Sequence, residues 1–296
     1  MKKFLLKIVL FFALCALAFG SATSIYIFRA RNFHFAFPPE KHVLFIGHSH
    51  IEVGIDPAIV PESINWAKSG NSYVSCSKRL SLALRDNPQI DTVFIAVAPH
   101  NFRKNVDGGL GTRKDASWNA FDYFPYCSLR EFFKIYGMNG VRAVLKNPIQ
   151  LARSVLLESR EAAQKRLGGY LYHPRKSLEK DLHGGFEKRY SVLDHGGEGI
   201  LYGYFRKMVD ECRARNIRVI ALNMPLYHAN EFYDTAYFYK KFRELFPDVE
   251  LWDYADFPIS DDCRADINHL NCWGAEIFSK EIAERMAHEG IIRDAR

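Results

Sequence analysis

A chain of 296 residues with 48% hydrophobic and 25% charged side chains is long enough to bury one large core or two small ones. This composition excludes a disordered or fibrous protein, and the sequence has no evident internal repeat. The net charge is +6, and residues 103–195 carry a basic excess, with 17 Lys and Arg against 10 Asp and Glu. Such a segment suggests anionic glycans or lipid headgroups as neighbours, although a solvated basic face without a partner explains it equally well.

Residues 1–31 have the pattern of an N-terminal membrane anchor or signal segment. Three lysines precede an uncharged run from Ile8 to Phe28, and these 21 residues would form a helix about 30 Å long, the thickness of a bilayer's hydrocarbon core. Small residues within 13–22 offer a cleavage point, but the apolar run continues beyond them, which favours an uncleaved anchor. The basic N-terminus predicts that the following domain is extracytoplasmic, on the periplasmic face of a bacterial inner membrane, or secreted if the segment is cleaved.

Residues 32–296 alternate between apolar runs and helical patterns, which predicts one α/β domain. Apolar runs typical of buried strands occupy residues 42–47, 64–69, 92–98, 217–223 and 249–254. Helical patterns fall at about 72–86, 128–137, 148–167, 197–214, 229–245 and 273–288. This alternation favours a three-layer α/β/α sandwich around a parallel sheet of about five strands.

Residues 103–195 are too long for a plain crossover between two strands. We interpret them as an inserted helical and loop region, with one long helix near 148–167. Insertions at the carboxyl edge of a parallel sheet commonly shape access to a site there.

Two polar segments supply a possible nucleophile and its base. Ser49 lies in a Gly-His-Ser-His segment directly after the first predicted strand, where a serine faces the crevice at the carboxyl edge of the sheet. Asp266 stands three residues before His269, just ahead of the last predicted helix. A serine hydroxyl needs a base to accept its proton, and that base needs a carboxylate at its other nitrogen. The simpler alternative is a helix-capping Asp beside an ordinary surface His.

Two further segments supply possible hydrogen-bond donors. Gly70 follows the second predicted strand, and Asn101 follows the third. Acyl transfer requires donors aimed at a developing oxyanion, and the amides of Ser49 and Gly70 with the side chain of Asn101 are the natural candidates. Each residue taken singly is more simply explained as a turn residue.

These four segments, in this order, resemble the SGNH/GDSL hydrolase superfamily over residues 42–288, and the Asp-x-x-His before the last helix is the most specific match. The resemblance implies that Ser49 is the nucleophile, that Asp266 and His269 complete a triad, and that the donors named above form the oxyanion hole. Within this superfamily, the anchor followed by Gly-x-Ser-His is more similar to the envelope acyl-transfer branch than to the secreted lipases. That branch includes the alginate O-acetylation proteins and the D-alanyl transfer protein of teichoic acid synthesis.

The chain departs from the family pattern in two places. His48 stands where the family's Gly-Asp-Ser has its acidic residue, and the family's Gly-x-Asn-Asp is replaced by Ala-Pro-His-Asn ending at Asn101. The second change leaves open whether His100 or Asn101 faces the site. We expect His48, His50, Asn71 and His100 to lie near the substrate.

A metal site at His48, His50 and His100 is an alternative use of these histidines, because alternate residues of an extended segment share a face. No carboxylate lies beside them in the sequence, and metal binding would compete with a triad. We therefore predict no metal and no other cofactor.

The six cysteines show no metal-binding spacing. Cys263 and Cys272 bracket the Asp-x-x-His segment and could form a disulfide in an oxidising compartment, but spacing alone does not establish a pair.

The resemblance implies a serine acyl-esterase or O-acyltransferase that acts on ester-linked acyl groups, with acetyl on an envelope or exported polysaccharide as the first expectation. It also implies a membrane-embedded acyltransferase as a possible partner, and we expect no nucleic-acid partner. Aromatic side chains of the insertion could stack on sugar rings, although core packing is their commoner role. The alternative is a catalytically inactive relative that binds glycans or acts as a scaffold in an envelope complex.

Overall fold

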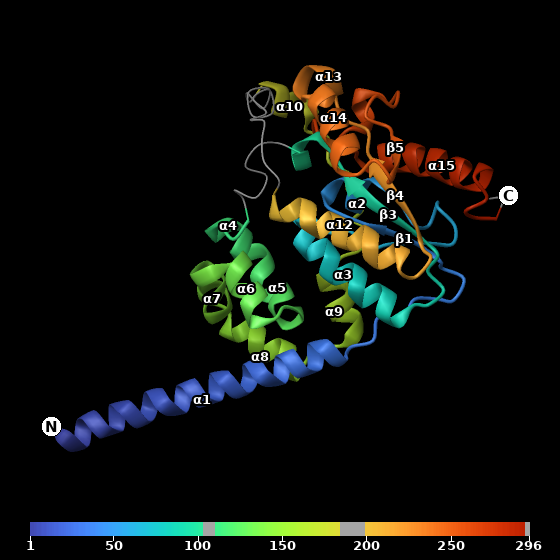
Figure 1. Ribbon diagram of the computed structural model, residues 1–296. Coiled ribbons are helices and arrows are strands. Elements are labelled where there is room, and N and C mark those ends of the chain that lie inside the picture. Colours follow the sequence, from blue (N-terminus) through green and yellow to red (C-terminus); the bar gives the residue numbers. More distant parts are fainter. Residues whose placement is uncertain (103–109, 184–198, 294–296) are drawn as a thin grey trace. The chain divides into compact units, whose positions relative to one another are not determined.

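The computed structural model describes residues 1–102, 110–183 and 199–293, apart from the side chains of Asn230 and Phe232 (Figure 1). The chain divides into two compact units. One unit, which we call the helical unit, comprises residues 1–34 and 110–166, and the other, the sheet unit, comprises residues 35–109 and 167–296. The segment 103–195, interpreted above as one insertion, is therefore shared between the two units.

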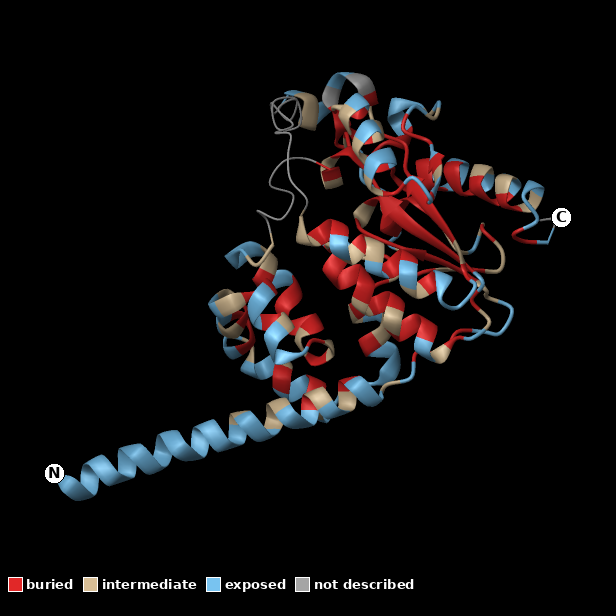
Figure 2. Ribbon diagram, in the orientation of Figure 1, coloured by how far each residue is buried: buried red, intermediate tan, exposed pale blue. Residues whose placement is uncertain are grey.

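A five-stranded parallel sheet forms the centre of the sheet unit, in the order β2-β1-β3-β4-β5. Its strands are β1 (Val43–Ile46), β2 (Ser63–Asn65), β3 (Thr92–Val97), β4 (Arg218–Asn223) and β5 (Glu250–Asp253). Every residue of β1 and β3 is buried, as expected for strands covered on both faces (Figure 2). The predicted α/β class and parallel sheet are confirmed.

Helices cover both faces of this sheet. On one face, α2 (Ser49–Gly54) and α15 (Cys272–His288) bury Ile51, Phe278 and Ile282 against Phe45 and Phe94 of the strands. α3 (Tyr73–Asp86) and α12 (Ile200–Arg213) pack on each other and against β1 and β4. The remaining elements of this unit are η1 (Pro99–Phe102), α10 (Leu178–His183), α13 (Ala229–Phe232), α14 (Thr235–Leu245) and η5 (Asp261–Cys263).

Two predicted elements are shorter than their hydrophobic patterns. β2 ends at Asn65 instead of residue 69, because the Asn65 side chain accepts the N–H of Ala67 at 3.0 Å and so turns the chain. The helix expected over 229–245 is two helices, because Asp234 accepts the N–H of Tyr237 at 3.0 Å and caps a new helix there.

The helical unit combines the N-terminal segment with part of the predicted insertion. Its elements are α1 (Lys2–Asn32), α4 (Arg113–Asp115), η3 (Ala116–Ala120), α5 (Phe121–Tyr123), η4 (Phe124–Tyr126), α6 (Leu129–Ile135), α7 (Gly137–Leu145), α8 (Pro148–Leu156) and α9 (Arg160–Leu167). The expectation of one long helix over 148–167 is wrong. Ser159 caps the start of α9 by accepting the N–H of Ala162 at 3.2 Å, while Arg29 binds the last carbonyls of α8.

α1 is long and apolar enough to cross a membrane, and none of its apolar window is buried. Its C-terminal turns, in contrast, pack on the other helices of the unit. Tyr26 is buried and its ring stacks on that of Phe121, with centroids 5.2 Å apart. The Arg29 guanidinium donates to backbone carbonyls of α8 and to that of Glu158, the latter at 2.9 Å. The candidate membrane span is therefore continuous with a folded unit.

Candidate active site

Ser49 is the first residue of α2, directly after the carboxyl end of β1, and its side chain is half-buried. The connection from strand to helix passes through Gly47. A Cβ on Gly47 would lie 2.3 Å from the Cβ of Ala96 on β3, so only glycine allows this close approach. The two neighbouring strands thereby fix the position from which the Ser49 hydroxyl projects.

The structure brings Ser49, His269 and Asp266 together in a chain of hydrogen bonds. The Ser49 Oγ lies 2.7 Å from Nε2 of His269. On the other side of the ring, Nδ1 lies 2.8 Å from Oδ1 and 2.9 Å from Oδ2 of Asp266. A carboxylate only accepts, so Nδ1 carries the proton and Nε2 is left to accept the serine hydroxyl. This is the hydrogen-bond order that a serine nucleophile and its base require.

The Asp266 carboxylate is held ionised and in place by its own turn. Burial alone raises the pKa of this carboxyl, but hydrogen bonds from the His269 ring and from the backbone amides of Asn268 and His269 outweigh it, so the pKa lies below its usual value. Those two amides donate to Oδ1 at 2.8 and 2.9 Å. The carboxylate therefore stays charged at neutral pH, as it must to stabilise an imidazolium.

The turn that carries Asp266 and His269 is closed on itself before α15 begins. Ala265 donates its N–H to the carbonyl of His269 at 2.9 Å, and Asn271 caps α15 by accepting the amides of Trp273 and Gly274, each at 3.1 Å. A Cβ on Gly274 would lie 2.2 Å from the Cys263 carbonyl oxygen. Local geometry thus places the His269 ring, so the candidate base and its carboxylate lie within one short segment of sequence.

The predicted oxyanion residues occupy the loops after β2 and β3. Gly70 has φ 69°, a conformation that favours glycine. Glu52 of α2 accepts the N–H of Ser69 at 2.8 Å and is also hydrogen-bonded to the Ser69 hydroxyl, so α2 holds the loop beside Gly70. Asn101 lies in η1 and donates its N–H to the carbonyl of Ala98 at 2.9 Å. Their role as oxyanion donors stays a prediction.

Arg79 is a supporting residue that sequence reasoning missed. It lies on α3, its side chain is fully buried, and it donates to the carbonyl of Gly47 at 2.8 Å and to that of Leu167 at 3.2 Å. It also donates to Oδ1 of Asn71, which turns that predicted substrate-proximal residue toward the protein interior. A single arginine in a helical pattern gives no sequence signal that it will be buried.

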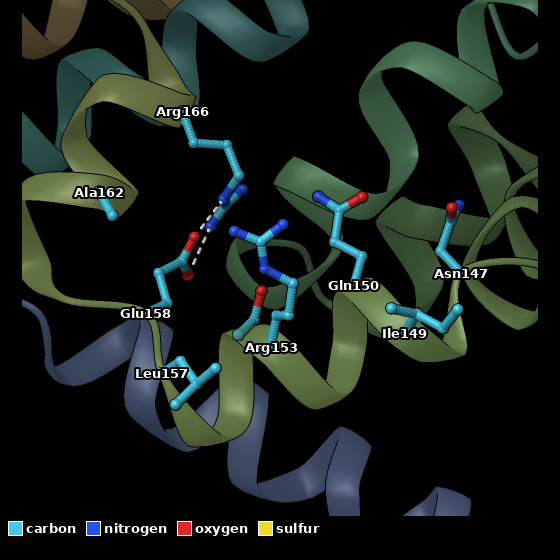
Figure 3. Close-up of a pocket in the computed structure, with 9 residues that line it drawn as sticks. Asn147, Ile149, Gln150, Arg153, Leu157, Glu158, Ala162 and Arg166 are labelled. Atoms are coloured by element: carbon cyan, nitrogen blue, oxygen red, sulfur yellow. Dashed lines mark hydrogen bonds and ion pairs between the residues drawn. The ribbon is translucent and has the colours of Figure 1, made fainter.

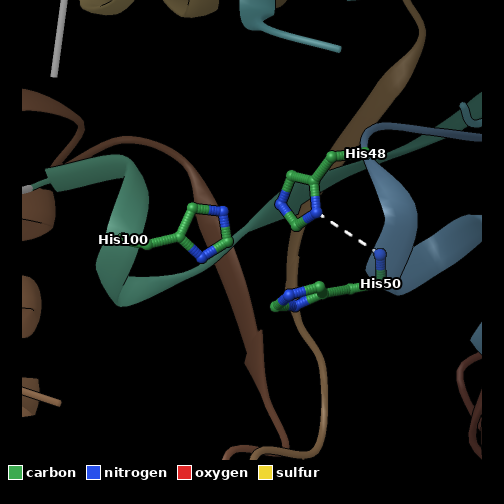
Figure 4. Close-up of side chains that lie close together, drawn as sticks. All are labelled: His48, His50 and His100. Carbon is green, nitrogen blue, oxygen red and sulfur yellow. Dashed lines mark hydrogen bonds between the residues drawn. The ribbon is translucent and has the colours of Figure 1, made fainter. Parts of the chain in front are cut away.

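His48, His50 and His100 lie close together as a cluster of three imidazoles (Figure 4). Their ring centroids lie 4.5 to 5.1 Å apart, and the ring of His50 also lies 5.2 Å from that of His269. Burial, together with the charge of His269, lowers the pKa of His48 to about 4, while an interaction with Asn101 acts in the opposite direction. Burial and the three neighbouring histidines hold the pKa of His50 well below its usual value. Both rings are therefore neutral at neutral pH.

Among the described residues, this cluster is the group of side chains that could hold a metal ion, because its ligand atoms lie within 4.8 Å of one another. Three imidazoles are a donor set that zinc accepts. Two features oppose binding. His48 Nδ1 accepts the N–H of His50 at 3.4 Å, so the ring proton is expected on Nε2, which then has no lone pair for an ion. A dication would also disfavour the imidazolium that the predicted role of His269 requires.

His173 and the aromatic side chains of Tyr172 and Trp273 lie on segments that adjoin the candidate triad. His173 accepts the N–H of Cys272 at 2.8 Å, and the positive charge of His269 contributes to lowering its pKa after the larger effect of burial. Tyr172 is 64% and Trp273 46% exposed. The hydrogen bond from the Cys272 N–H to the His173 carbonyl joins two segments, and each exposed ring is next in sequence to one of the bonded residues. Cys263 and Cys272 are free thiols, so the disulfide left open above is absent here.

A hollow of about 620 Å³ is lined entirely by residues of the helical unit (Figure 3). Arg166 there is paired with Glu158 at 2.7 Å and with Asp122 at 2.6 Å. Gln150 and Arg153 also line the hollow. The hollow contains no nucleophile and base in contact, so it is not the candidate active site. The aromatic residues Phe121 and Tyr123 of the predicted insertion are buried in this unit and form part of its core.

No protein-family model matches the sequence, and no curated protein is similar to it by sequence. Among solved structures, one from Bacteroides fragilis, provisionally described as an acylhydrolase, is similar with a TM-score of 0.40 and 14% identity over 89% of this chain and 95% of that chain. A GDSL-like lipase structure from Bacteroides thetaiotaomicron has a TM-score of 0.40 and 12% identity over 92% of this chain and 99% of that chain. At this low identity and TM-score, the likeness does not indicate the activity of this chain. Its chemistry has to be inferred from its own site.

Proposed function

We propose that this chain is a serine esterase or O-acyltransferase that forms an acyl-enzyme on Ser49. The observation that carries the proposal is the continuous hydrogen-bonded order Ser49, His269, Asp266, with 2.7 Å between Oγ and Nε2. This order lies at the carboxyl edge of a parallel sheet, where sites of such folds form. The resemblance of the surrounding segments to the SGNH/GDSL hydrolases is consistent with the same chemistry.

In the first half-reaction, Nε2 of His269 takes the proton of the Ser49 hydroxyl while Oγ forms a bond to the acyl carbonyl carbon. The bond to the alcohol oxygen of the substrate then breaks, and that oxygen leaves with the proton from Nε2. In the second half-reaction, water or a sugar hydroxyl gives its proton to Nε2 and attacks the acyl carbon, and Ser49 recovers its proton. An esterase and a transferase differ only in which acceptor arrives.

The oxyanion of each tetrahedral intermediate requires donors, and Asn101 is one of the three we assign, beside the amides of Ser49 and Gly70. An asparagine donates only through Nδ2, so its amide must be held in one orientation. Oδ1 of Asn101 and Nε2 of His48 are both buried and form no hydrogen bond of standard geometry among the described residues, although the Asn101 side chain already acts on the pKa of His48. A bond from Nε2–H to Oδ1, closed when substrate binds, would direct Nδ2 toward the oxyanion.

For substrate and location, we propose an acylated polysaccharide of the cell envelope and a site outside the membrane that α1 crosses. The exposed rings of Tyr172 and Trp273 are suited to stack on sugar rings. The packing of α1 on its own unit supports an anchor that is retained. A membrane-embedded acyltransferase that delivers the acyl group is the partner we propose for the transferase reaction, and acetyl is the acyl group we would test first.

The test is hydrolysis of p-nitrophenyl acetate by the full-length chain in detergent, with intact mass spectrometry for an acetyl adduct. We expect Ser49→Ala and His269→Ala to lower turnover by at least about 10³-fold, the scale of triad removal elsewhere. Ser260→Ala and His228→Ala replace an exposed serine and an exposed histidine, and should leave turnover unchanged.

An adduct that forms on the native chain and is absent from Ser49→Ala would establish the acyl-enzyme. Equal turnover by the native chain and by both triad variants would refute it. An adduct without turnover would indicate a transferase that waits for its acceptor, whereas neither adduct nor turnover in folded protein would favour an inactive glycan-binding or scaffold role.

A further inference from the structure

An apolar groove of about 420 Å³ runs beside α1 within the helical unit. One side of it is made by α1, through Phe19, Thr23 and Ile27. The other side is made by η4, α6 and α7, among them Phe132, Phe133, Val144 and Leu145. Apolar side chains dominate this lining, so the groove is suited to a hydrocarbon occupant.

The side chains at its rim are far more exposed than large apolar residues usually are. Leu129 is 79% exposed, Leu145 54% and Phe133 51%. Burying one such side chain contributes about 1.5–3 kcal/mol, so leaving the three in water is unfavourable by several kcal/mol. A contiguous apolar patch of this kind marks an interaction surface.

The position of the groove along α1 indicates what covers it. A hydrocarbon core takes about 20 helical residues, and counted from Ile8 these reach Ile27. The groove begins at Phe19 and includes Ile27, so it lies along the second half of that span. Residues 8–18 of α1 are uncharged and exposed, and they continue the same apolar surface toward the N-terminus.

Basic side chains alternate with the apolar ones on the same helices. Arg130 and Lys134 on α6 and Arg142 on α7 are exposed, and Lys146 follows α7 directly. Residues 110–166 hold ten Lys and Arg against five Asp and Glu. Apolar anchors mixed with basic residues are the pattern of helices that lie in a membrane interface and contact lipid phosphates.

We propose that this groove seats the acyl chains of phospholipids in the outer leaflet, so that the helical unit is embedded in the membrane interface and does not hang from α1 as a tether. The proposal rests on α1 crossing the membrane, as proposed above. The apolar rim side chains contact lipid tails, and the basic side chains of α6 and α7 contact the phosphates.

The test is photo-crosslinking of the full-length chain in vesicles of phosphatidylglycerol and phosphatidylcholine that contain a radiolabelled phospholipid. p-Benzoylphenylalanine replaces Phe133 in the groove or, as a control outside the proposed lipid contact, the exposed Lys240 on α14 of the sheet unit. We expect several-fold more labelled lipid on the chain with the probe at position 133. Both positions are exposed, so neither substitution should impair folding.

A covalent dimer at position 133 in place of a lipid adduct would show that a second copy covers the groove and would overturn the proposal. Equal lipid labelling at the two positions would overturn it as well. Alkaline carbonate extraction of the same vesicles separates this failure from that of the anchor, because a chain released into the soluble fraction does not cross the membrane at all.

Discussion

His269 takes part in two hydrogen bonds whose directions depend on each other. Asp266 can only accept, so it fixes the proton on Nδ1 and leaves the lone pair of Nε2 for Ser49. The same reasoning applies to His48, where acceptance of the His50 amide at Nδ1 leaves the proton on Nε2. In the proposed mechanism, the positions of single protons on two imidazoles therefore decide that Nε2 of His269 acts as base and Nε2 of His48 as donor.

Replacement of His48 tests whether it acts through Asn101. Loss of one oxyanion donor typically lowers kcat by about 10²–10³-fold, so we expect Asn101→Ala to show a loss of that order. His48→Ala should show part of it, but no further loss when added to Asn101→Ala, because the donor it orients is already gone. His48→Gln keeps a side-chain hydrogen-bond donor and should recover the activity that His48→Ala loses. The measurement is the rate at which a fluorophosphonate labels Ser49 in the native chain and in the four variants. Additive losses in the double variant would contradict a positioning role for His48.

The low pKa values in the histidine cluster predict a stability that depends on pH. The pKa of His48 is about 4 in the folded chain, against about 6.5 when unfolded, so the unfolded state binds more protons between these values. The free energy of unfolding should therefore fall as pH decreases from about 6.5 to about 4, by up to about 3 kcal/mol for His48 alone, with His50 acting in the same direction.

Urea unfolding at several pH values measures this slope. His48→Gln removes the titrating group and should give a flatter dependence than the native chain. The same slope in both chains would show that other groups, such as the Asp266 carboxyl, account for the acid sensitivity.

At the scale of elements, the loops that meet at the site are held by side chains from helices behind it. Arg79 of α3 binds the carbonyl of Gly47 after β1 and the side chain of Asn71 after β2. Glu52 of α2 accepts hydrogen bonds from the backbone N–H and the hydroxyl of Ser69. These charged side chains are buried or nearly so, and their bonds make the loop positions a consequence of how the helices pack.

Arg79→Met should destabilise the fold by about 2–4 kcal/mol, because buried acceptors in both loops lose their donor. Arg85→Met on the same helix replaces an exposed arginine paired with Asp86, and should cost less than about 1 kcal/mol. Chemical denaturation of the two variants measures the difference. Similar losses in both would mean that the Arg79 bonds contribute little.

At the scale of the whole molecule, the N-terminal helix and residues 110–166 fold as one unit although they are distant in sequence. Tyr26 and Ala30 are buried there, while Phe19 and Ala22 pack against the same cluster. Cleavage at the small residues within 13–22 would remove part of this packing. Signal segments that are cleaved have no such structural role, and this contrast argues for retention.

We therefore expect the chain isolated from bacterial membranes to keep its N-terminal segment. Intact mass and N-terminal sequencing would detect this directly. A Tyr26→Ala variant should lower the thermal stability of the isolated chain, because it opens the stacked contact with Phe121. A mature chain that starts within 14–23 would contradict retention and would leave the groove beside α1 incomplete.

The sequence by itself determined the sheet and the triad candidates. The fully buried strands β1 and β3 are continuous apolar runs, and parallel strands place the segments after them at one edge. Asp266 and His269 are three residues apart, so a local turn is enough to join them, and the pattern was visible without a fold. Only the distance from His269 to Ser49 needed tertiary structure.

The tertiary structure alone decided which side chains support that triad and how the inserted residues are used. The burial of Arg79, the closeness of His50 to His269 and the packing of α1 on α8 all join residues far apart in sequence. At the break between α8 and α9, Arg29 of another helix binds carbonyls at the end of α8, a contact that the local sequence does not indicate. Hydrophobic periodicity reports which face of a segment is buried, whereas the partner that buries it is set only when the chain packs.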